Sequence, residues 1–372
     1  MAKIVIGLSG GVDSAVSAYL LKEQGHEVIG VFMRNWDSFA NNDTLGNKSI
    51  NDAICPQEVD YQDAVETAKI IGIPIHRVDF VKEYWSSVFE NFISEYKKGR
   101  TPNPDILCNK YIKFDKLLNY ALEELGADFL ATGHYAMTKN GKLYRGLDET
   151  KDQSYFLSQL SNDQLSKVIF PLSDLTKKEV REIANKQNLN VASKKDSTGI
   201  CFIGERNFSE FLENYIPAMN GNIVDIDTNE IIGKHKGVMY YTIGQRKGLN
   251  LGGMLEPHFV VSKDVQNKII YAAPLSKEDY LFSNKLIATD LNIISDKFNS
   301  DNLTAKFRYR QDDDEVFVEL IREENQIIVN YPNKQLAITP GQQIVFYLGK
   351  ECLGGAIIDR VFLNNKELKI IF

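Results

Sequence analysis

The feature that most constrains this chain is a glycine- and serine-rich turn that follows a short apolar strand near the N-terminus. Residues 4–6 are Ile-Val-Ile, residues 7–14 are Gly-Leu-Ser-Gly-Gly-Val-Asp-Ser, and apolar residues recur at 12, 15, 16, 19 and 20. This spacing predicts a strand, a tight turn and a helix. Glycines let backbone N–H groups face one concavity, and the unpaired N–H groups at the start of a helix attract anions. The predicted phosphate site comprises Gly7, Leu8, Ser9, Gly10, Gly11, Val12, Asp13 and Ser14.

The turn differs from the two commonest nucleotide loops. It has no lysine, which a Walker A loop requires, and it does not fit G-x-G-x-x-G. The pattern S-G-G-x-D-S resembles the PP-loop of ATP pyrophosphatases, which split ATP into AMP and pyrophosphate while adenylating a substrate oxygen. The resemblance implies ATP as the ligand, with Asp13 near the phosphates through a Mg²⁺ ion. From the residue alone, Asp13 is also explained as a favourable charge at a helix N-terminus.

The first 205 residues alternate between strand and helix patterns. Strands are predicted at 3–8, 27–33, 74–79 and 128–132, and helices at 12–24, 57–71, 81–98 and 111–125. This alternation predicts an α/β domain with a Rossmann-like parallel sheet. Because ligands bind beyond the carboxyl ends of such strands, Met33 and Gly133 are expected at the same crevice as the glycine turn. The polar residues 35–51 predict a mobile loop near the nucleotide.

The remaining residues have a different pattern. A helix is predicted from Phe208 to Tyr215, followed by short strands with glycine-rich turns. From about residue 276 the pattern is all-β, which predicts a small β-barrel. The predicted division is therefore 1–207 for the PP-loop ATP-binding catalytic domain, 208–275 for a small central domain and 276–372 for a C-terminal β-barrel.

Composition limits the partners and the compartment. The net charge of −7 argues against binding nucleic acid by bulk electrostatics, so local basic clusters such as 97–100, 194–206 and 306–310 would be needed. No signal peptide or membrane-length apolar run is evident, so we expect no membrane association and a cytoplasmic location. The four cysteines form no C-x-x-C pair, which disfavours a structural zinc site or a disulfide framework. No protein-held metal is expected.

Two cysteines lie in segments that suit chemistry. Residues 100–110 contain two prolines, which predict a rigid loop that presents Asp105 and Cys108 rather than burying them. Their i, i+3 spacing fits one side of a helical turn, and a carboxylate beside a thiol suits proton transfer and nucleophilic or redox work. Cys201 lies among basic residues that include Lys194, which favour its thiolate. Cys55 and Cys352 lack such settings and are predicted to be structural.

Seven segments together resemble one family, the bacterial tRNA-specific 2-thiouridylases. They are residues 7–14, 100–109, 131–135, 151–157, 196–206, 244–249 and 339–342. The resemblance as a whole runs from residue 7 to about residue 355. It implies a PP-loop domain, a small central tRNA-binding domain and a C-terminal β-barrel, with tRNA lying across all three. It also implies a sulfurtransferase reaction, in which ATP adenylates O2 of the wobble uridine and a persulfide sulfur then replaces that oxygen.

The resemblance also assigns residues by position. Cys201 would hold the persulfide, Cys108 would free the sulfur, and Asp105 would be the general base. The two cysteines would end as a disulfide that a reductant reopens, although which thiol attacks which atom stays open. A cysteine desulfurase or a sulfur-relay protein would supply the sulfur. The residues that would contact tRNA are Asn103, Pro104, Asp105, Lys151, Asp152, Gln153, Arg308 and Tyr309. For residues 151–153, a helix start with Asp152 near its cap is an equally good explanation.

Two other functions remain open from the sequence. One is an amide-forming PP-loop enzyme, which would not need Cys108 and Cys201. The other, from a different class, is a tRNA-binding protein that senses ATP without hydrolysing it, and it would release no pyrophosphate. Serine substitutions at the cysteines test the first alternative, and pyrophosphate release with tRNA tests the second.

Overall fold

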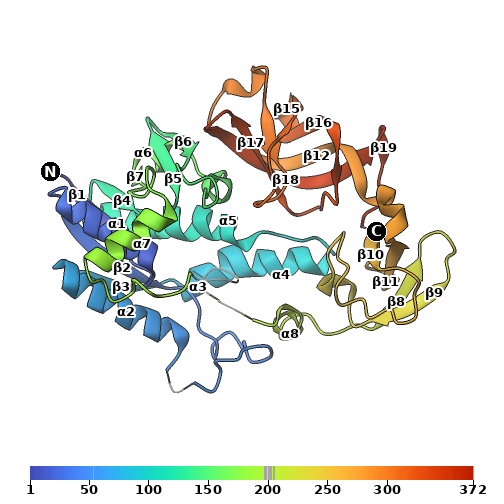
Figure 1. The fold of residues 1–372 in the computed structure, drawn as a ribbon, viewed down its shortest axis with the longest axis horizontal. Helices are drawn as coiled ribbons and strands as arrows, with labels where there is room; N and C mark the ends of the chain where they lie inside the picture. The colour runs from blue at the N-terminus through green and yellow to red at the C-terminus, as the bar shows by residue number, and fades with distance from the viewer. Residues whose placement is uncertain (53, 197–198, 200–202, 204–205, 372) are drawn as a thin grey trace.

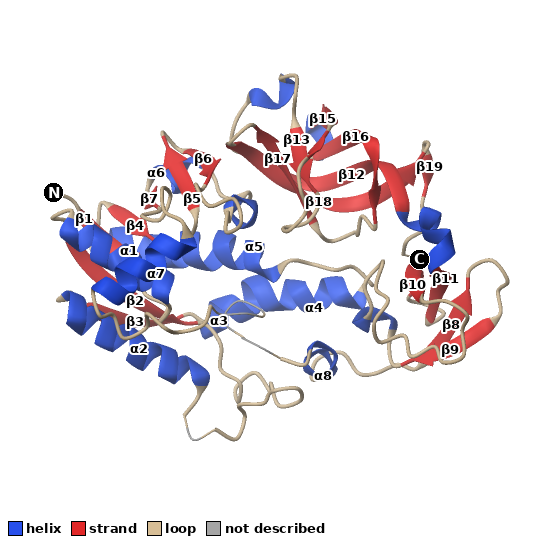
Figure 2. Ribbon diagram, in the orientation of Figure 1, coloured by secondary structure: helices blue, strands red, loops and turns tan. Residues whose placement is uncertain are grey.

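The computed structural model describes residues 1–52, 54–196, 199, 203 and 206–371, which form three sheets with associated helices (Figures 1 and 2). The first sheet has the order β3-β2-β1-β4-β7, and every neighbouring pair is parallel, which confirms the predicted α/β class. Its strands and helices are β1 (Lys3–Gly7), α1 (Val12–Glu23), β2 (Glu27–Arg34), α2 (Pro56–Ile71), β3 (Ile75–Asp79), α3 (Val81–Tyr84), α4 (Glu90–Lys97), α5 (Pro104–Cys108), β4 (Phe129–Ala131), α6 (Asn162–Ser166), β7 (Val168–Ile169) and α7 (Lys177–Lys186).

Both faces of this sheet are covered. Ile4 and Ile6 of β1 are fully buried in a cluster with residues of α1 and α2. Val5, which points to the other face, belongs to the larger core that α3, α4 and α5 help to form. The order of the sheet reverses at β1, so the crevice beyond its carboxyl end is where ligands of such sheets bind.

The helix predicted at 81–98 is confirmed, but the one predicted at 111–125 begins earlier. α3 passes through a π-helical segment (Trp85–Phe89) into α4, and the buried face of this helix comprises Val88, Phe89, Phe92, Ile93 and Tyr96. α5 starts at Pro104 and continues through π-helical segments Asn109–Leu117 and Tyr120–Glu124. Asn103 caps α5 by accepting a hydrogen bond from the Asp105 N–H at 3.2 Å. The prediction of an exposed rigid loop was therefore wrong, because a proline at the first helical position starts a helix.

The loop predicted at 35–51 is built around a buried carboxylate. Asp43 is fully buried and accepts hydrogen bonds from Trp36 Nε1 at 3.0 Å and from Arg206 Nη2 at 2.9 Å. The next residues of the loop bind Asn214, just beyond α8 (Phe208–Glu213). Arg206, counted in a predicted basic cluster, is thus the partner of a buried acid rather than a surface cation.

The second and third sheets follow along the chain. The second has the order β10-β11-β8-β9 and consists of β8 (Gly221–Asp225), β9 (Ile231–His235), β10 (His258–Asp264) and β11 (Ile269–Pro274). In Figure 1 it lies at the end of the molecule farthest from β1, and the third sheet lies above α4. The third sheet consists of β5 (Ala136–Lys139), β6 (Lys142–Arg145), β12 (Phe282–Ile293), β13 (Thr304–Lys306), β14 (Asp314–Glu315), β15 (Phe317–Ile321), β16 (Gln326–Leu336), β17 (Gln343–Leu348), β18 (Glu351–Leu363) and β19 (Lys366–Glu367).

One hairpin of the third sheet comes from the N-terminal part of the chain. β5 and β6 are joined by Asn140 and Gly141, both at positive φ, and β6 pairs with β18. The sequence predictions did not include this hairpin. In the part of the chain that the structure describes, no helix combines the length and apolarity needed to cross a membrane.

A buried cation in the second sheet gives a pH-dependent prediction. Lys263 is 0% exposed, its Nζ donates to the Tyr241 carbonyl at 2.8 Å, and burial lowers its pKa from 10.5 to about 7. Between these values the folded chain binds fewer protons than the unfolded chain, so this group makes stability rise with pH from about 7 to 10.5. Lys263→Met should remove that rise. Urea unfolding of both proteins at several pH values checks it, and parallel stability curves would contradict it.

Candidate active site

The glycine turn between β1 and α1 has the geometry of an anion site. Gly10 has φ +73°, and a Cβ on it would lie 2.2 Å from the Asp60 carbonyl oxygen. Ser14 Oγ accepts from the Ser9 N–H at 3.1 Å and donates to the Gly11 carbonyl at 3.0 Å. Gly11 is the N-cap of α1, and no side chain of the described residues caps this helix. Its first N–H groups are therefore available to a phosphate.

The end of β4 packs directly against this turn. A Cβ on Gly133 would lie 2.8 Å from both the Asp13 carbonyl carbon and the Ser14 nitrogen. Only glycine allows the two backbone segments to approach this closely. Met33 lies near the end of β2, which pairs with β1 in the same sheet. The three strand ends predicted to meet at the crevice are thus neighbours in one parallel sheet.

A carboxylate in the first turn of α1 is held by a lysine from α7. Asp13 accepts hydrogen bonds from Lys177 Nζ at 2.7 and 2.9 Å and from the Tyr135 hydroxyl at 2.8 Å. Burial, followed by the charge of Asp13, raises the pKa of Tyr135. Neither partner of Asp13 was predicted from the sequence. A Thr-Lys-Lys-Glu capping box marks the start of α7, but nothing local shows that its lysine reaches a turn 164 residues away.

The same lysine connects the turn to the residues at 151. Lys177 Nζ lies 2.8 Å from Asp196, which also binds Lys151 at 2.9 Å and Arg181 at 2.8 Å. Burial alone would raise the pKa of Asp196, but hydrogen bonds from Lys177 and Lys151 outweigh it and lower this pKa to about 2. Asp196 therefore links Lys151, which is predicted to contact tRNA, to Lys177. Lys177 in turn binds Asp13 in the phosphate turn.

Lys194, predicted to favour the thiolate of Cys201, also reaches the phosphate turn. Its Nζ donates to the Gly10 carbonyl at 2.9 Å, to Asp60 at 2.7 Å and to Asp63 at 2.5 Å. Cys201 itself lies outside the described residues. Lys194 thus supports the backbone of the turn from the side of α2.

Asn103 caps α5, and the helix runs from Pro104 to Cys108. Asp105 is partly buried in its first turn, and Cys108, one turn later, is 0% exposed. The predicted i, i+3 arrangement is thus present, whereas the predicted exposure of the thiol is not. Directly after it, Asn109 Nδ2 donates to the Phe156 carbonyl at 3.0 Å. This bond joins the cysteine segment to residues 151–157.

Residues 151–153 have mixed surroundings. Asp152 is 5% exposed and accepts hydrogen bonds from the Ser154 N–H at 3.2 Å and its hydroxyl at 2.8 Å. Burial raises the pKa of Asp152, although hydrogen bonds from Ser154 oppose this. These contacts fit the alternative of a carboxylate near a helix start. Gln153 Oε1 accepts from the Tyr135 N–H at 3.0 Å, so it lies beside the partner of Asp13.

Tyr309, which lies just after β13 of the third sheet, packs beside residues 151–157. Its ring centroid lies 4.3 Å from that of Phe156, and the neighbouring Arg308 is exposed. Phe156 therefore lies where three segments meet, namely residues 103–109, 151–157 and 308–309. Among the described residues predicted to act on tRNA, Asp152 is the one whose burial leaves little surface for direct contact.

Comparison with known proteins gives matches along nearly the whole chain. Family models match residues 2–205 ("tRNA methyl transferase HUP domain"), 209–274 ("tRNA methyl transferase PRC-barrel domain") and 283–358 ("Aminomethyltransferase beta-barrel domain"). A protein named tRNA-specific 2-thiouridylase MnmA from Mycoplasmopsis pulmonis is 63% identical over 99% of both chains. This chain belongs to the MnmA family. A relative with the same name from Mycoplasmopsis synoviae is 62% identical over 98% of this chain and 97% of its own.

Three solved structures found by comparison resemble the chain only distantly, at 16–18% identity. An NMN synthetase from Francisella tularensis covers 53% of this chain and 66% of its own with a TM-score of 0.32 and 18% identity, too little to support an inference. Membership of the MnmA family, together with the phosphate turn, implies that the chain binds ATP. It also identifies the third sheet as the C-terminal β-barrel, as predicted.

Of the other candidate groups of this MnmA family member, His134 and Cys352 are buried, whereas Cys55 is exposed. His134 Nδ1 shares a 2.8 Å hydrogen bond with the Thr132 hydroxyl, and burial lowers its pKa. Cys352 is buried in β18, and burial raises its pKa to about 12. Cys55 is exposed at the start of α2. Residues 1–52, 54–196, 199, 203 and 206–371 contain no group of three or more His, Cys, Asp or Glu that could hold a metal.

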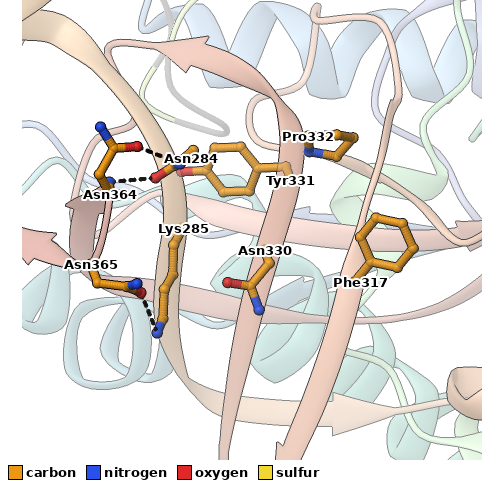
Figure 3. A pocket seen from close by; sticks show the side chains of 8 residues that line it. All are labelled: Asn284, Lys285, Phe317, Asn330, Tyr331, Pro332, Asn364 and Asn365. Atoms are coloured by element: carbon orange, nitrogen blue, oxygen red, sulfur yellow. Dashed lines mark hydrogen bonds between the residues drawn. The ribbon is translucent and has the colours of Figure 1, made fainter.

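A cavity of about 270 Å³ lies on the barrel (Figure 3). Asn284 and Asn364 are joined by hydrogen bonds of 2.9 and 3.2 Å, and Lys285 donates to Asn365 at 3.3 Å. The exposed ring of Phe317 forms part of the wall. None of the residues predicted for catalysis, ATP or tRNA lines this cavity, so it is separate from the candidate active site.

Proposed function

We propose that this protein catalyses ATP-dependent 2-thiolation of the wobble uridine in tRNA anticodons, releasing AMP and pyrophosphate. The observation that carries the proposal is 63% identity to a 2-thiouridylase over 99% of both chains, which includes all three sheets. The matching family models bear the words methyl transferase. Thiolation is favoured over methyl transfer because it needs both a nucleotide loop and sulfur-bearing side chains.

The phosphate turn is proposed to bind ATP. Its residues fit because Gly10 and Gly133 leave room for close approach, and α1 begins without a side-chain cap among the described residues. ATP supplies the AMP group that turns uridine O2 into a leaving group. Asp13 would be the carboxylate that holds a Mg²⁺ ion, which would supply positive charge to the phosphates, and Lys177 supplies a further positive charge beside Asp13. Met33, near the end of β2, lies at the side of the crevice where the adenine base of ATP would bind.

Asp105, Cys108 and Cys201 are proposed to carry the sulfur chemistry. The terminal sulfur of a persulfide on Cys201 attacks C2 of the activated uridine, and AMP leaves. The Cys108 thiolate then attacks the Cys201 sulfur, which releases 2-thiouridine and leaves a Cys108–Cys201 disulfide for an external reductant. Asp105 acts as general base. Because Cys108 is buried, its side of the site must open before the thiol meets its partner.

The substrate and partners follow from this chemistry. Lys151, Gln153, Arg308 and Tyr309, together with the segment at 103–105, are proposed to contact the tRNA, whose target base must leave its stack to reach the pocket. A cysteine desulfurase or a relay protein would load the persulfide, and we propose a cytoplasmic location. The division into 1–207, 208–275 and 276–372 is retained as the proposed domain arrangement.

The experiment that tests this function is nucleoside mass analysis. Unmodified tRNA is incubated with the protein, Mg-ATP, cysteine and a cysteine desulfurase, with Cys201→Ser as control. We expect 2-thiouridine only with intact Cys201. Pyrophosphate release without thiolation would favour an amide-forming enzyme, and the absence of both products would favour an ATP-sensing binder.

A further inference from the structure

The proposed tRNA contacts of the barrel, Arg308 and Tyr309, lie in one loop. Residues 307–312 connect β13 to β14, and the guanidinium-bearing residues Arg308 and Arg310 are exposed there. The Gln311 N–H donates to the Arg308 carbonyl at 3.2 Å, so the chain turns back at this point. Guanidinium groups suit phosphate, which recurs along every tRNA. The position of the loop therefore decides which phosphates its arginines reach.

Asp313 closes the base of this loop. Its carboxylate accepts a hydrogen bond from Thr304 Oγ1 at 2.8 Å and lies 4.0 Å from Lys306 Nζ, and both residues belong to β13. The same carboxylate binds Nη2 of Arg145 in β6. Asp313 thus joins the two ends of the loop to each other and to a residue 168 positions earlier in the chain.

Arg145 is itself held from several sides. Its guanidinium carbon lies 3.7 Å from the centre of the Tyr347 ring in β17, within the range of a cation–π contact. Its backbone N–H donates to the Lys350 carbonyl at 2.9 Å. Within the described part of the chain, the buried Nε has no hydrogen-bond partner. The Tyr347 ring and the Asp313 carboxylate are therefore the groups that hold this guanidinium in place.

The hairpin that carries Arg145 is also attached to the phosphate turn. Arg145 faces Ala136 in the ladder between β5 and β6. The residue before Ala136 is Tyr135, whose hydroxyl donates to Asp13 at 2.8 Å. Contacts therefore run from the phosphate turn through the hairpin to Asp313 and the loop. The N-terminal part of the chain thereby places the loop relative to the ATP site.

We propose that Arg145 is a positioning residue for tRNA binding, because it fixes Asp313 and, with it, the loop of residues 307–312. The inference rests on the proposed tRNA contacts of Arg308 and Tyr309 in that loop. The side chain of Arg145 is only 16% exposed, so it acts through the loop rather than on the tRNA. Its planar guanidinium suits this role, since a lysine ammonium cannot both stack on an aromatic ring and bind the carboxylate in the same way.

Arg145→Met in the full-length protein tests this inference by tRNA binding at several salt concentrations. Because the loop loses its anchor, the tRNA Kd should rise about tenfold, and the slope of log Kd against log salt concentration should fall by about one, as for a lost phosphate contact. The KM for ATP at saturating tRNA should stay within about twofold of the original value. Lys139→Met removes an equal charge from an exposed position of the same hairpin and should change neither quantity.

Asp313→Ala separates positioning from charge. Removing a negative charge near the tRNA would by itself tighten binding, whereas loss of the anchor should weaken it, again by about tenfold. Tighter or unchanged tRNA binding by Asp313→Ala would overturn the inference. An unchanged Kd for Arg145→Met would do the same.

A double-mutant cycle with Arg308→Ala tests whether Arg145 acts through the loop. In the Arg308→Ala protein, adding Arg145→Met should raise the tRNA Kd by no more than about threefold. A further rise of about tenfold would mean that the two residues act independently, and the inference would be wrong. If Arg308→Ala alone leaves the Kd and the salt slope unchanged, the proposed tRNA contact fails and the inference fails with it. If Arg308→Ala weakens binding while Arg145→Met does not, only the inference fails.

Discussion

Cys108→Ser should lower 2-thiouridine formation by at least about a thousandfold, while a stoichiometric burst of pyrophosphate is still released before the uncleaved adduct blocks the enzyme. A serine hydroxyl cannot accept the oxidised sulfur of the partner cysteine, so the last bond cannot break. The phosphate turn is untouched by this change, because it is built by residues 7–14 and packed against Gly133. Parallel assays of nucleoside composition and of pyrophosphate with tRNA measure the two steps separately.

Cys352→Ser is the control for burial in this experiment. Both thiols are 0% exposed, so placing a hydroxyl at either site carries a similar penalty, roughly 1–3 kcal/mol if the hydroxyl finds no partner. Cys352 lies in β18 of the barrel and should keep thiolation. Equal loss of thiolation in both variants would mean that Cys108 acts through stability alone. Full activity of Cys108→Ser would exclude it from the reaction.

Gly133→Ala should lower kcat/KM for ATP by about a hundredfold, in both pyrophosphate release and thiolation. The added methyl group would lie 2.8 Å from backbone atoms of Asp13 and Ser14, closer than real contacts allow. The start of α1 must then move away from β4, which displaces the N–H groups that face the phosphates. The measurement is the ATP dependence of pyrophosphate release at saturating tRNA.

Gly252→Ala is the matched substitution, because no heavy atom lies within 4 Å of a Cβ at that position. It should leave ATP use unchanged. If Gly133→Ala retains the original kcat/KM for ATP, the nucleotide must bind at another site. Together with Cys108→Ser, this variant distinguishes loss of activation from loss of sulfur transfer, since only Gly133→Ala should slow the first round of pyrophosphate release.

Features set by local sequence were predictable. The glycine turn, the strand and helix that flank it and the helix at 81–98 follow from short periodic patterns, and all are present. The start of α5 was mispredicted although its signal was there, because Asn103 and Pro104 are the cap and first residue of a helix. Likewise Asn-Gly at 140–141 is typical of a hairpin turn, and β5 and β6 were still missed.

Features that depend on distant partners were not predictable. Lys177 is one of 43 basic residues, and nothing near it in the sequence shows that it binds Asp13. The ion pair of Asp43 with Arg206 spans 163 positions and has no local signal in the sequence. Residues 35–51 were therefore predicted to be a mobile loop. The role of Cys201 still rests on sequence, because that residue lies outside the described part of the structure.

The pairing of β6 with β18 has a consequence for engineering this family. Leu143 and Tyr144 face Cys352 and Glu351 in the ladder, and Arg145 lies 3.7 Å above the ring of Tyr347 while also bonding to Asp313. The barrel sheet is thus completed by a strand that lies some two hundred positions before its partner β18 in the chain. A chimaera that exchanged only the C-terminal third between two relatives would join mismatched halves of one ladder. Residues 136–145 must therefore be exchanged together with the barrel.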